Sequence, residues 1–296
     1  MPKKPSPPTY VDQLLSELAD MESSYQVLLD SSQVKARQMN HGGIQILGHP
    51  WAWVPSTPDA ETSRMGLLRQ VRDWAPRFRL LFPHPTPKVQ RGMDDANRLL
   101  EDWLVRGREV KYRAPADIQS AKKRLTEAAA ALRELVELLP PDDWTVRVVV
   151  DTNTLIDDPD VSLYKDSVGS RYMVHLLPVV LREVDDLKRS HSRPELREAA
   201  RRADRRLKAM RDNGDVRVGA RIAGDVYAIF EHIEPRADGL PTWLDLDVPD
   251  DRFIASTLLL QSQHPGSKLY AATSDINLQT KLAAVGLPYV AGPSGK

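Results

Sequence analysis

Apolar positions recur along the chain with one period in its first half and another in its second. In residues 9–139 they return every three or four residues, which predicts amphipathic helices. The predicted helices cover residues 9–29, 60–74, 88–105 and 115–139. Between the first two helices, residues 41–58 contain repeated Gly and Pro, so we predict an irregular loop that holds one short strand.

Residues 144–296 instead alternate short β-branched runs with helical patterns, which is typical of a mainly parallel sheet with crossover helices. Strands are predicted at 146–150, 171–177, 216–218, 226–230, 268–273 and 288–291. Helices are predicted from Pro178, over 194–213 with Gly214 as the stop, after 248–251 and after 274–275. The fold class is therefore α/β: a mainly α-helical N-terminal domain (1–143) that ends in a Pro-rich linker, followed by an α/β domain (144–296).

Composition narrows the environment of the protein and the chemistry open to it. The absence of Cys excludes disulfides and thiolate metal sites. No apolar run approaches the roughly 20 residues that span a bilayer, and residues 1–8 resemble a disordered tail more than a signal peptide. We therefore expect a soluble, cytoplasmic protein without a membrane partner. The 41 Lys and Arg balance the 41 Asp and Glu, so a polyanion must bind to a local patch.

Acidic residues recur where an apolar run gives way to a helix. They are Asp151, Asp250 or Asp251, and Asp275, with Glu183 on the helix that starts at Pro178. The polar face of that helix carries Glu183 and Asp186, and Asp185 is a further candidate for it. Because the carboxyl ends of parallel strands share one edge of a sheet, we expect these side chains to converge. Crowded carboxylates repel one another unless a cation neutralises them, and oxygen ligands suit Mg²⁺ or Mn²⁺. The pattern points to metal-assisted phosphodiester hydrolysis.

Each acid also has a structural interpretation. Asp is a favoured N-cap, so Asp151, Asp250 and Asp275 could each only cap a helix. Glu183 taken alone could be an exposed helix residue. From the pattern alone, the two interpretations are evenly balanced.

The N-terminal half offers weaker signals. Its histidines, which are His41, His49 and His84, have no partner at a metal-binding spacing, and we expect them to be structural or solvated. Its tryptophans could stack on bases, but Trp74 and Trp103 fall on apolar helix faces. Core packing is therefore the favoured interpretation.

Four short motifs resemble those of PIN-domain nucleases, in the same order along residues 146–292. They are residues 149–156, 177–188, 250–254 and 273–278. Within that family, the pattern resembles the PIN domains found beside PhoH-type ATPases and those of mRNA-surveillance endonucleases, which share the form Val-Leu-x-Glu-x-Asp-x-x-Lys and a basic helix after it. This chain has no phosphate-binding loop that ends in Gly-Lys-Ser/Thr, so nothing supports an ATPase activity.

The resemblance implies a three-layer α/β/α domain with a metal-dependent ribonuclease site. Catalytic and metal-binding roles fall on Asp151, Glu183, Asp251 and Asp275, with Asp250 as a neighbour that could help to bind Mg²⁺ or Mn²⁺. Supporting or substrate contacts fall on Asn153, Asp185 and Asn277.

A basic helix is the best candidate for contact with nucleic acid. Arg197, Arg201, Arg205 and Lys208 are three or four residues apart and align on one face of the helix predicted over 194–213. Such a run is also compatible with a solvated face, because acidic residues dilute it. The expected partner is RNA, with DNA as an alternative. The N-terminal helices could recognise RNA, form a homo-oligomer or bind an antitoxin or another regulatory partner.

Three functions are compatible with the sequence. The first is an endoribonuclease acting on single-stranded RNA, either toxin-like or a decay factor. The second is a DNA-directed nuclease, because the metal chemistry does not distinguish the sugars. The third is a non-catalytic PIN scaffold, against which the four acids argue.

Overall fold

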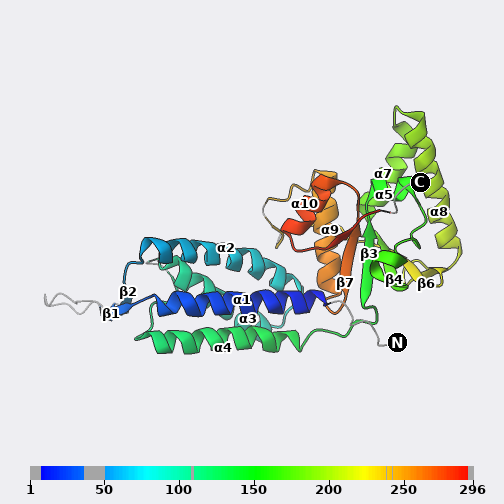
Figure 1. Cartoon of the computed structure of the whole chain (residues 1–296). Coiled ribbons are helices and arrows are strands. Elements are labelled where there is room, and N and C mark those ends of the chain that lie inside the picture. Colours follow the sequence, from blue (N-terminus) through cyan, green and yellow to red (C-terminus); the bar gives the residue numbers. More distant parts are fainter. Residues whose placement is uncertain (1–7, 37–50, 108–109, 238, 242, 293–296) are drawn as a thin grey trace. The chain divides into compact units, whose positions relative to one another are not determined.

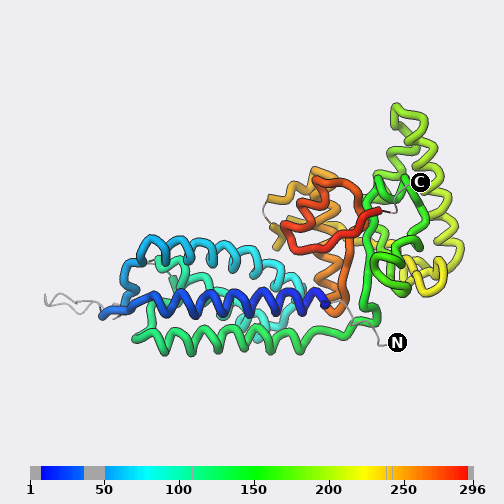
Figure 2. The backbone as a smooth tube through the Cα atoms, in the orientation of Figure 1, coloured from blue at the N-terminus to red at the C-terminus, as the bar shows by residue number. Residues whose placement is uncertain are grey.

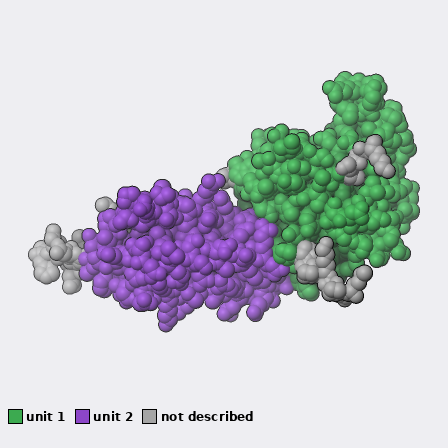
Figure 3. Space-filling model, viewed as in Figure 1, with its two compact units in different colours: residues 1–10, 140–296 green, residues 11–139 purple. Residues whose placement is uncertain are grey.

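A computed structural model describes residues 8–36, 51–107, 110–237, 239–241 and 243–292 of the chain. The chain divides into two compact units, which Figure 1 shows as ribbons and Figure 3 in separate colours. One unit is Val11–Leu139, and the other is Pro140–Lys296 together with the residues before Val11. The division falls at the first proline of the Pro-rich linker.

The first unit is built mainly from four helices and a small antiparallel sheet. The helices are α1 (Tyr10–Asp30), α2 (Pro58–Leu80), α3 (Pro87–Val105) and α4 (Ile118–Val136), and the strands are β1 (Val34–Ala36) and β2 (Trp51–Trp53). Helix α3 packs against both α2 and α4. The four predicted helices and the short strand before Pro58 are therefore confirmed.

Helix α2 is longer than its pattern predicts, because it continues through Pro76 to Leu80. A proline inside a helix costs about 3 kcal/mol. Packing offsets this cost, since the buried rings of Trp74 and Phe78 stack with centroids 4.7 Å apart. The indole N–H of Trp74 also donates to the Leu14 carbonyl at 2.9 Å. Burial of these aromatic groups outweighs the break that the local sequence favours.

Core packing is confirmed for two of the tryptophans of this unit, whereas Trp51 and Trp53 are only half-buried. Trp74 and Trp103 are buried in the core. His84 is exposed at the surface. His41 and His49 lie outside the described residues.

The second unit contains a six-stranded sheet with the order β5-β6-β4-β3-β7-β8. Its strands are β3 (Val146–Val150), β4 (Arg171–Leu176), β5 (Ala220–Ala223), β6 (Asp225–Phe230), β7 (Lys268–Ala272) and β8 (Tyr289–Val290). All neighbouring strands are parallel except β5 and β6. The predicted α/β class with a mainly parallel sheet is confirmed.

Helices cover both faces of this sheet, as Figure 1 shows, with α9 and α10 on one side and α5, α7 and α8 on the other. The helices of the unit are α5 (Thr152–Asp157), α6 (Lys165–Val168), α7 (Pro178–Ser190), α8 (Pro194–Asp212), α9 (Pro249–Gln263) and α10 (Ile276–Ala284). Helices α7 and α8 lie side by side in the tube of Figure 2, and Lys188 of α7 pairs with Asp204 of α8 at 3.0 Å. The arrangement is the predicted three-layer α/β/α domain.

Strand β3 is the centre of the sheet, and all five of its residues are buried. Its two neighbours are β4, the next parallel strand along the chain, and β7, which follows much later. The direction in which strands are added therefore reverses at β3. In open α/β sheets, ligands bind beyond the carboxyl ends of the strands at such a reversal. Asp151 directly follows that end of β3.

The strand predicted at 216–218 is wrong. These residues form a turn, and Val218 is 75% exposed. The carboxylate of Asp215 accepts the backbone N–H of Arg217 at 3.0 Å and also pairs with its guanidinium, which favours the turn over a strand. Gly219, with a φ of 126°, then redirects the chain into β5.

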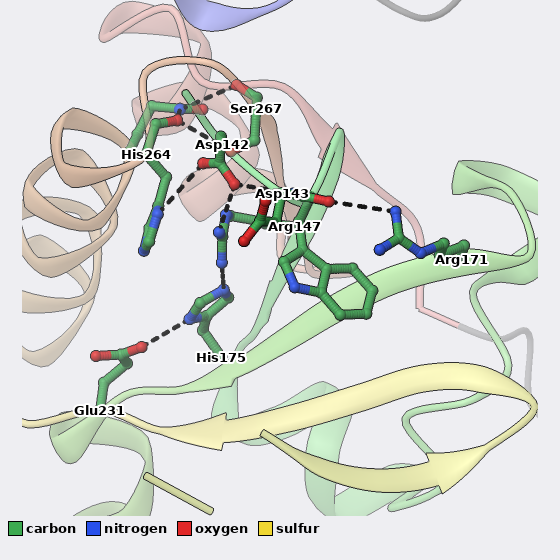
Figure 4. A network of polar contacts seen from close by, with 10 residues as sticks. Asp142, Asp143, Arg147, Arg171, His175, Glu231, His264 and Ser267 are labelled. Carbon is green, nitrogen blue, oxygen red and sulfur yellow. Dashed lines mark hydrogen bonds and ion pairs between the residues drawn. The ribbon is translucent and has the colours of Figure 1, made fainter. Parts of the chain in front are cut away.

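A buried polar network crosses one face of the sheet, as drawn in Figure 4. The guanidinium of Arg147 donates to Asp142 at 2.7 Å and to Nε2 of His175 at 2.9 Å. Because a guanidinium only donates, Nε2 must accept, and the ring proton lies on Nδ1. Nδ1 donates to the carboxylate of Glu231 at 2.7 Å. His175 is therefore held as a neutral ring between a cation and an anion.

Burial shapes the titration of this network. Burial and the Arg147 cation together lower the pKa of His175 to about 4, against the opposing hydrogen bond with Glu231. Burial by itself raises the pKa of Glu231, but the hydrogen bond from His175 and the neighbouring charges, including Arg147, together outweigh burial and leave the pKa lowered. Both groups therefore resist protonation in the folded state.

We expect the protein to lose stability as the pH falls from 6.5, the ordinary pKa of histidine, to about 4. In this window the unfolded chain binds a proton at His175 that the folded chain does not bind, so the free energy of unfolding falls, by on the order of 3 kcal/mol. Urea unfolding at a series of pH values measures the slope. His175→Gln keeps an amide donor and acceptor without titrating and should flatten it, whereas His232→Gln, at an exposed position, should not. Equal slopes for all three proteins would contradict the assignment.

Candidate active site

A cavity of about 480 Å³ opens at the carboxyl edge of the sheet. The size is that of pockets that bind small ligands. Its lining comes from α5, α7, α9 and α10 and the turns beside them. The lining residues are Asp151, Thr152, Asn153, Glu183, Asp186, Leu187, Ser190, His191, Pro249, Asp250, Phe253, Asp275 and Leu278. Three of the four predicted acids therefore face one space.

Asp151 is held from two directions where β3 ends. As the N-cap of α5, it accepts the backbone N–H of Thr154 through Oδ1 at 2.6 Å. Its Oδ2 accepts the hydroxyl of Thr273, which follows β7. The carboxylate caps a helix and also lines the cavity, so its structural and functional interpretations are compatible.

Thr273 links the ends of the two central strands. Its buried hydroxyl donates to Asp151 and accepts the backbone N–H of Asp275 at 3.1 Å. The sequence assigned no separate role to Thr273. The available signal was a hydroxyl residue at the end of an apolar run, two residues before an acid. A hydroxyl at the end of one strand can reach the end of the neighbouring strand, as Thr273 after β7 reaches Asp151 after β3.

Glu183 extends from α7 into the cavity, where its carboxylate accepts the hydroxyl of Thr152. Burial raises its pKa, and the negative charges of Asp250 and Asp151 raise it further against the opposing hydrogen bond from Thr152. Glu183 therefore lies in a half-buried and acidic part of the cavity.

The helical repeat decides which acids of α7 reach the cavity. Glu183, Asp186 and Ser190 are spaced by three and four residues and all line it. Asp185, for which the resemblance implies a supporting role, does not line it. Its carboxylate instead pairs with Lys188 at 2.5 Å and with Arg189 at 3.5 Å. Asp186 lines the cavity instead, although the sequence assigned it no role in the site.

In the first turn of α9, two adjacent acids have different surroundings. Asp250 lines the cavity, and its pKa is raised by burial and by the charges of Asp275, Asp251 and Asp151, against the opposing charge of Lys281. Val248 is the N-cap of α9, so Asp250 is not a cap.

Asp251 is absent from the cavity lining. Its carboxylate accepts Nζ of Lys281 at 2.5 Å and the backbone N–H of Asp245 at 3.0 Å. Burial by itself raises the pKa of Asp251, but these two hydrogen bonds outweigh burial and leave it lowered. The role that the resemblance implies for Asp251 stays a prediction, and the geometry favours Asp250.

Asp275 completes the acidic part of the lining as the N-cap of α10. It accepts the backbone N–H groups of Asn277 at 2.7 Å and Leu278 at 3.1 Å. Asn277 is exposed and contributes this N–H, but its side chain is absent from the lining. Asn153 is exposed and does line the cavity, as a substrate contact would.

The family model of the PIN domain matches residues 148–291 of the chain. This segment is a PIN domain. The match covers nearly all of the region whose motifs resemble the family, and that resemblance is confirmed. PIN domains are generally nucleases, and PIN nucleases typically use divalent metal ions. No curated protein shows significant sequence similarity to the chain.

The oxygen donors of the PIN domain cavity fit a divalent cation. Asp151, Glu183, Asp250 and Asp275 are carboxylates, the ligands that Mg²⁺ and Mn²⁺ prefer. The raised pKa values of Glu183 and Asp250 mark negative charge that protein cations only partly balance. Within the described ranges, no three acidic or imidazole groups lie close enough together to form a ready metal-ligand group.

The four basic residues predicted to bind nucleic acid have partners within the PIN domain. Arg201 and Arg205 pair with Glu198 at 3.7 and 3.1 Å, and Lys208 pairs with Asp204 at 2.8 Å. The side chains of Arg201, Arg205 and Lys208 are all more than half exposed. These ion pairs are therefore open to competition from phosphate.

Arg197 differs from the other three. Its guanidinium donates to the carbonyl groups of His191 at 2.6 Å and Ser192 at 3.4 Å. It therefore holds the turn between α7 and α8. A role in nucleic-acid binding stays a prediction for all four residues.

No helix in the described part of the chain is both long enough and apolar enough to cross a membrane. The cytoplasmic location stays a prediction.

Replacing Thr273 by Val should lower the free energy of unfolding by about 1–3 kcal/mol, because a buried carboxylate oxygen of Asp151 loses its hydroxyl donor. Thr273→Ser keeps the hydroxyl and is the matched control. Urea unfolding of the two variants measures the difference. Equal stability of the Val and Ser variants would show that this hydrogen bond is dispensable.

Calorimetric titration with Mn²⁺ should separate the roles of Asp250 and Asp251. Asp250→Asn should weaken binding about tenfold or more, since it removes a carboxylate that lines the cavity. Asp251→Asn should change binding less and instead lower the free energy of unfolding by about 1 kcal/mol, because solvent screens its pair with the partly exposed Lys281. If Asp251→Asn weakens Mn²⁺ binding more than Asp250→Asn does, the metal ligand is Asp251.

Proposed function

We propose that this protein is a metal-dependent endoribonuclease that hydrolyses phosphodiester bonds of single-stranded RNA. The observation that carries the proposal is the convergence of Asp151, Glu183, Asp250 and Asp275 on one cavity of the PIN domain. Four oxygen donors at the switch point of a parallel sheet supply the ligand chemistry that such a reaction needs.

In this proposal the carboxylates hold one or more Mg²⁺ or Mn²⁺ ions. When bound, such an ion lowers the pKa of a coordinated water and stabilises the negative charge that develops on the transferring phosphoryl group. Asp251, next to Asp250 in the first turn of α9, pairs with Lys281, and the charges of both residues act on Asp250.

The surrounding side chains orient the ligands. The hydroxyl of Thr152 binds Glu183, and that of Thr273 binds Asp151. Ordered neighbours of this kind keep ligand oxygens in place before the ion arrives. Asn153, exposed at the cavity, is a donor and acceptor for the substrate.

The choice of RNA rests on the resemblance of the motifs to those of mRNA-surveillance endonucleases. The carboxylates themselves do not discriminate between ribose and deoxyribose, so DNA is the alternative substrate. A scaffold without activity is the other alternative. The experiment below includes an arm for each.

Asp151→Asn should abolish Mn²⁺-dependent cleavage of single-stranded RNA, with a loss of at least about 100-fold, while the protein stays folded. Asn is as good an N-cap as Asp, so α5 keeps its cap and only the charge is lost. Cleavage of labelled RNA and of DNA of the same sequence, with and without Mn²⁺, gives the rate, and thermal unfolding confirms the fold. Asp157→Asn, at an exposed position of the same helix, is the control.

Full activity of Asp151→Asn would contradict the site. Preferential cleavage of DNA would show that the substrate is DNA and not RNA. If the wild-type protein cleaves neither nucleic acid with Mn²⁺, the scaffold alternative stands.

A further inference from the structure

The lining of the cavity presents a charge problem for a nucleic acid. Five of its 13 residues are carboxylates, and none of these described lining residues is Lys or Arg. A phosphodiester strand is negatively charged at every phosphate. Bound divalent ions neutralise the site at the carboxylates, but the adjoining phosphates of the same strand also need donors.

His191 lies on the α7 side of this cavity. It follows Ser190, the last residue of α7, and its backbone leaves the helix there with a φ of −69° and a ψ of 138°. Glu183 and Ser190 are seven residues apart, which is about 10 Å along a helix axis. His191 is therefore displaced along the cavity from the carboxylate that would bind metal.

Two hydrogen bonds fix the imidazole and its backbone. Nδ1 accepts the backbone N–H of Arg193 at 3.1 Å, so the proton of the neutral ring lies on Nε2. The carbonyl of His191 accepts the guanidinium of Arg197 at 2.6 Å. The turn thus holds the ring with one N–H donor left for a ligand. His191 is half-buried and lines the cavity, so part of the residue is open to a ligand.

We propose that His191 is a substrate-positioning residue, whose Nε2–H donates to a phosphate oxygen of the nucleotide next to the one that is cleaved. The inference rests on the proposed nuclease function and adds a contact outside the carboxylate centre. Arg197 acts through His191 by holding the turn. It reaches the substrate indirectly, whereas Arg201 and Arg205 project further along α8.

The test is steady-state cleavage of a short single-stranded RNA with Mn²⁺ by the full-length protein. His191→Ala should raise KM about tenfold, the loss expected for a hydrogen bond to a charged group, and change kcat less than about threefold. His191→Phe keeps a ring without a donor and should behave like the Ala variant. His191→Gln keeps an N–H donor and should recover most of the affinity. His232→Ala, at an exposed position away from the cavity lining, is the matched control.

The Mn²⁺ concentration for half-maximal activity separates positioning from metal binding. It should be the same for wild-type protein and His191→Ala. A shift of tenfold or more would make His191 a metal ligand and overturn the proposal. An unchanged KM in His191→Ala, or equal losses in the Ala, Phe and Gln variants, would also overturn it.

Fluorescence anisotropy with the same RNA in Ca²⁺ measures binding whether or not cleavage occurs. His191→Ala should weaken binding about tenfold, and His191→Gln should not. If the wild-type protein binds but does not cleave, the proposed nuclease function fails while this contact is still tested. If binding is equal in wild type and His191→Ala, the contact itself is refuted.

Discussion

The hydrogen bonds that hold carboxylates at the carboxyl edge of β3 are the interactions on which the cavity of the PIN domain depends. Asp151, Glu183, Asp250 and Asp275 come from different elements but line one cavity. Local hydrogen bonds hold Asp151, Glu183 and Asp275 there. Helix caps fix Asp151 and Asp275, and threonine hydroxyls bind Asp151 and Glu183. The energy of folding thus maintains a group of like charges that is suited to a divalent cation.

The buried polar network of the same sheet obeys the opposite rule. Around Arg147 each charge has a counter-charge or a neutral acceptor within hydrogen-bonding distance, in Asp142, His175 and Glu231. Buried charges are tolerated when they are paired in this way. In the cavity, by contrast, several carboxylates face a space that a ligand can enter. This contrast distinguishes the candidate active site from the structural polar groups around it.

Helix α8 gives a physical reason why charge patterns alone are poor guides to binding surfaces. Its basic residues look equivalent in sequence, yet Arg197 holds the turn at His191 while Arg201 and Arg205 share Glu198. The proposed substrate contact therefore lies in the turn, on a histidine with no distinguishing motif. Helix α8 thus supports the turn through Arg197 and exposes the cations of Arg201 and Arg205 at its surface.

The sequence by itself determined the α/β class and most of the strands, because buried parallel strands require β-branched runs. It also determined the order of the acids, because each acid is part of a short motif that can be read from the sequence. Tertiary packing decided that α2 continues through Pro76, and the turn at Asp215 removed a predicted strand. The tertiary structure alone brought Asp250 to the cavity and paired Asp251 with Lys281, since adjacent residues of a helix point in different directions and only the neighbouring helix supplies the counter-charge.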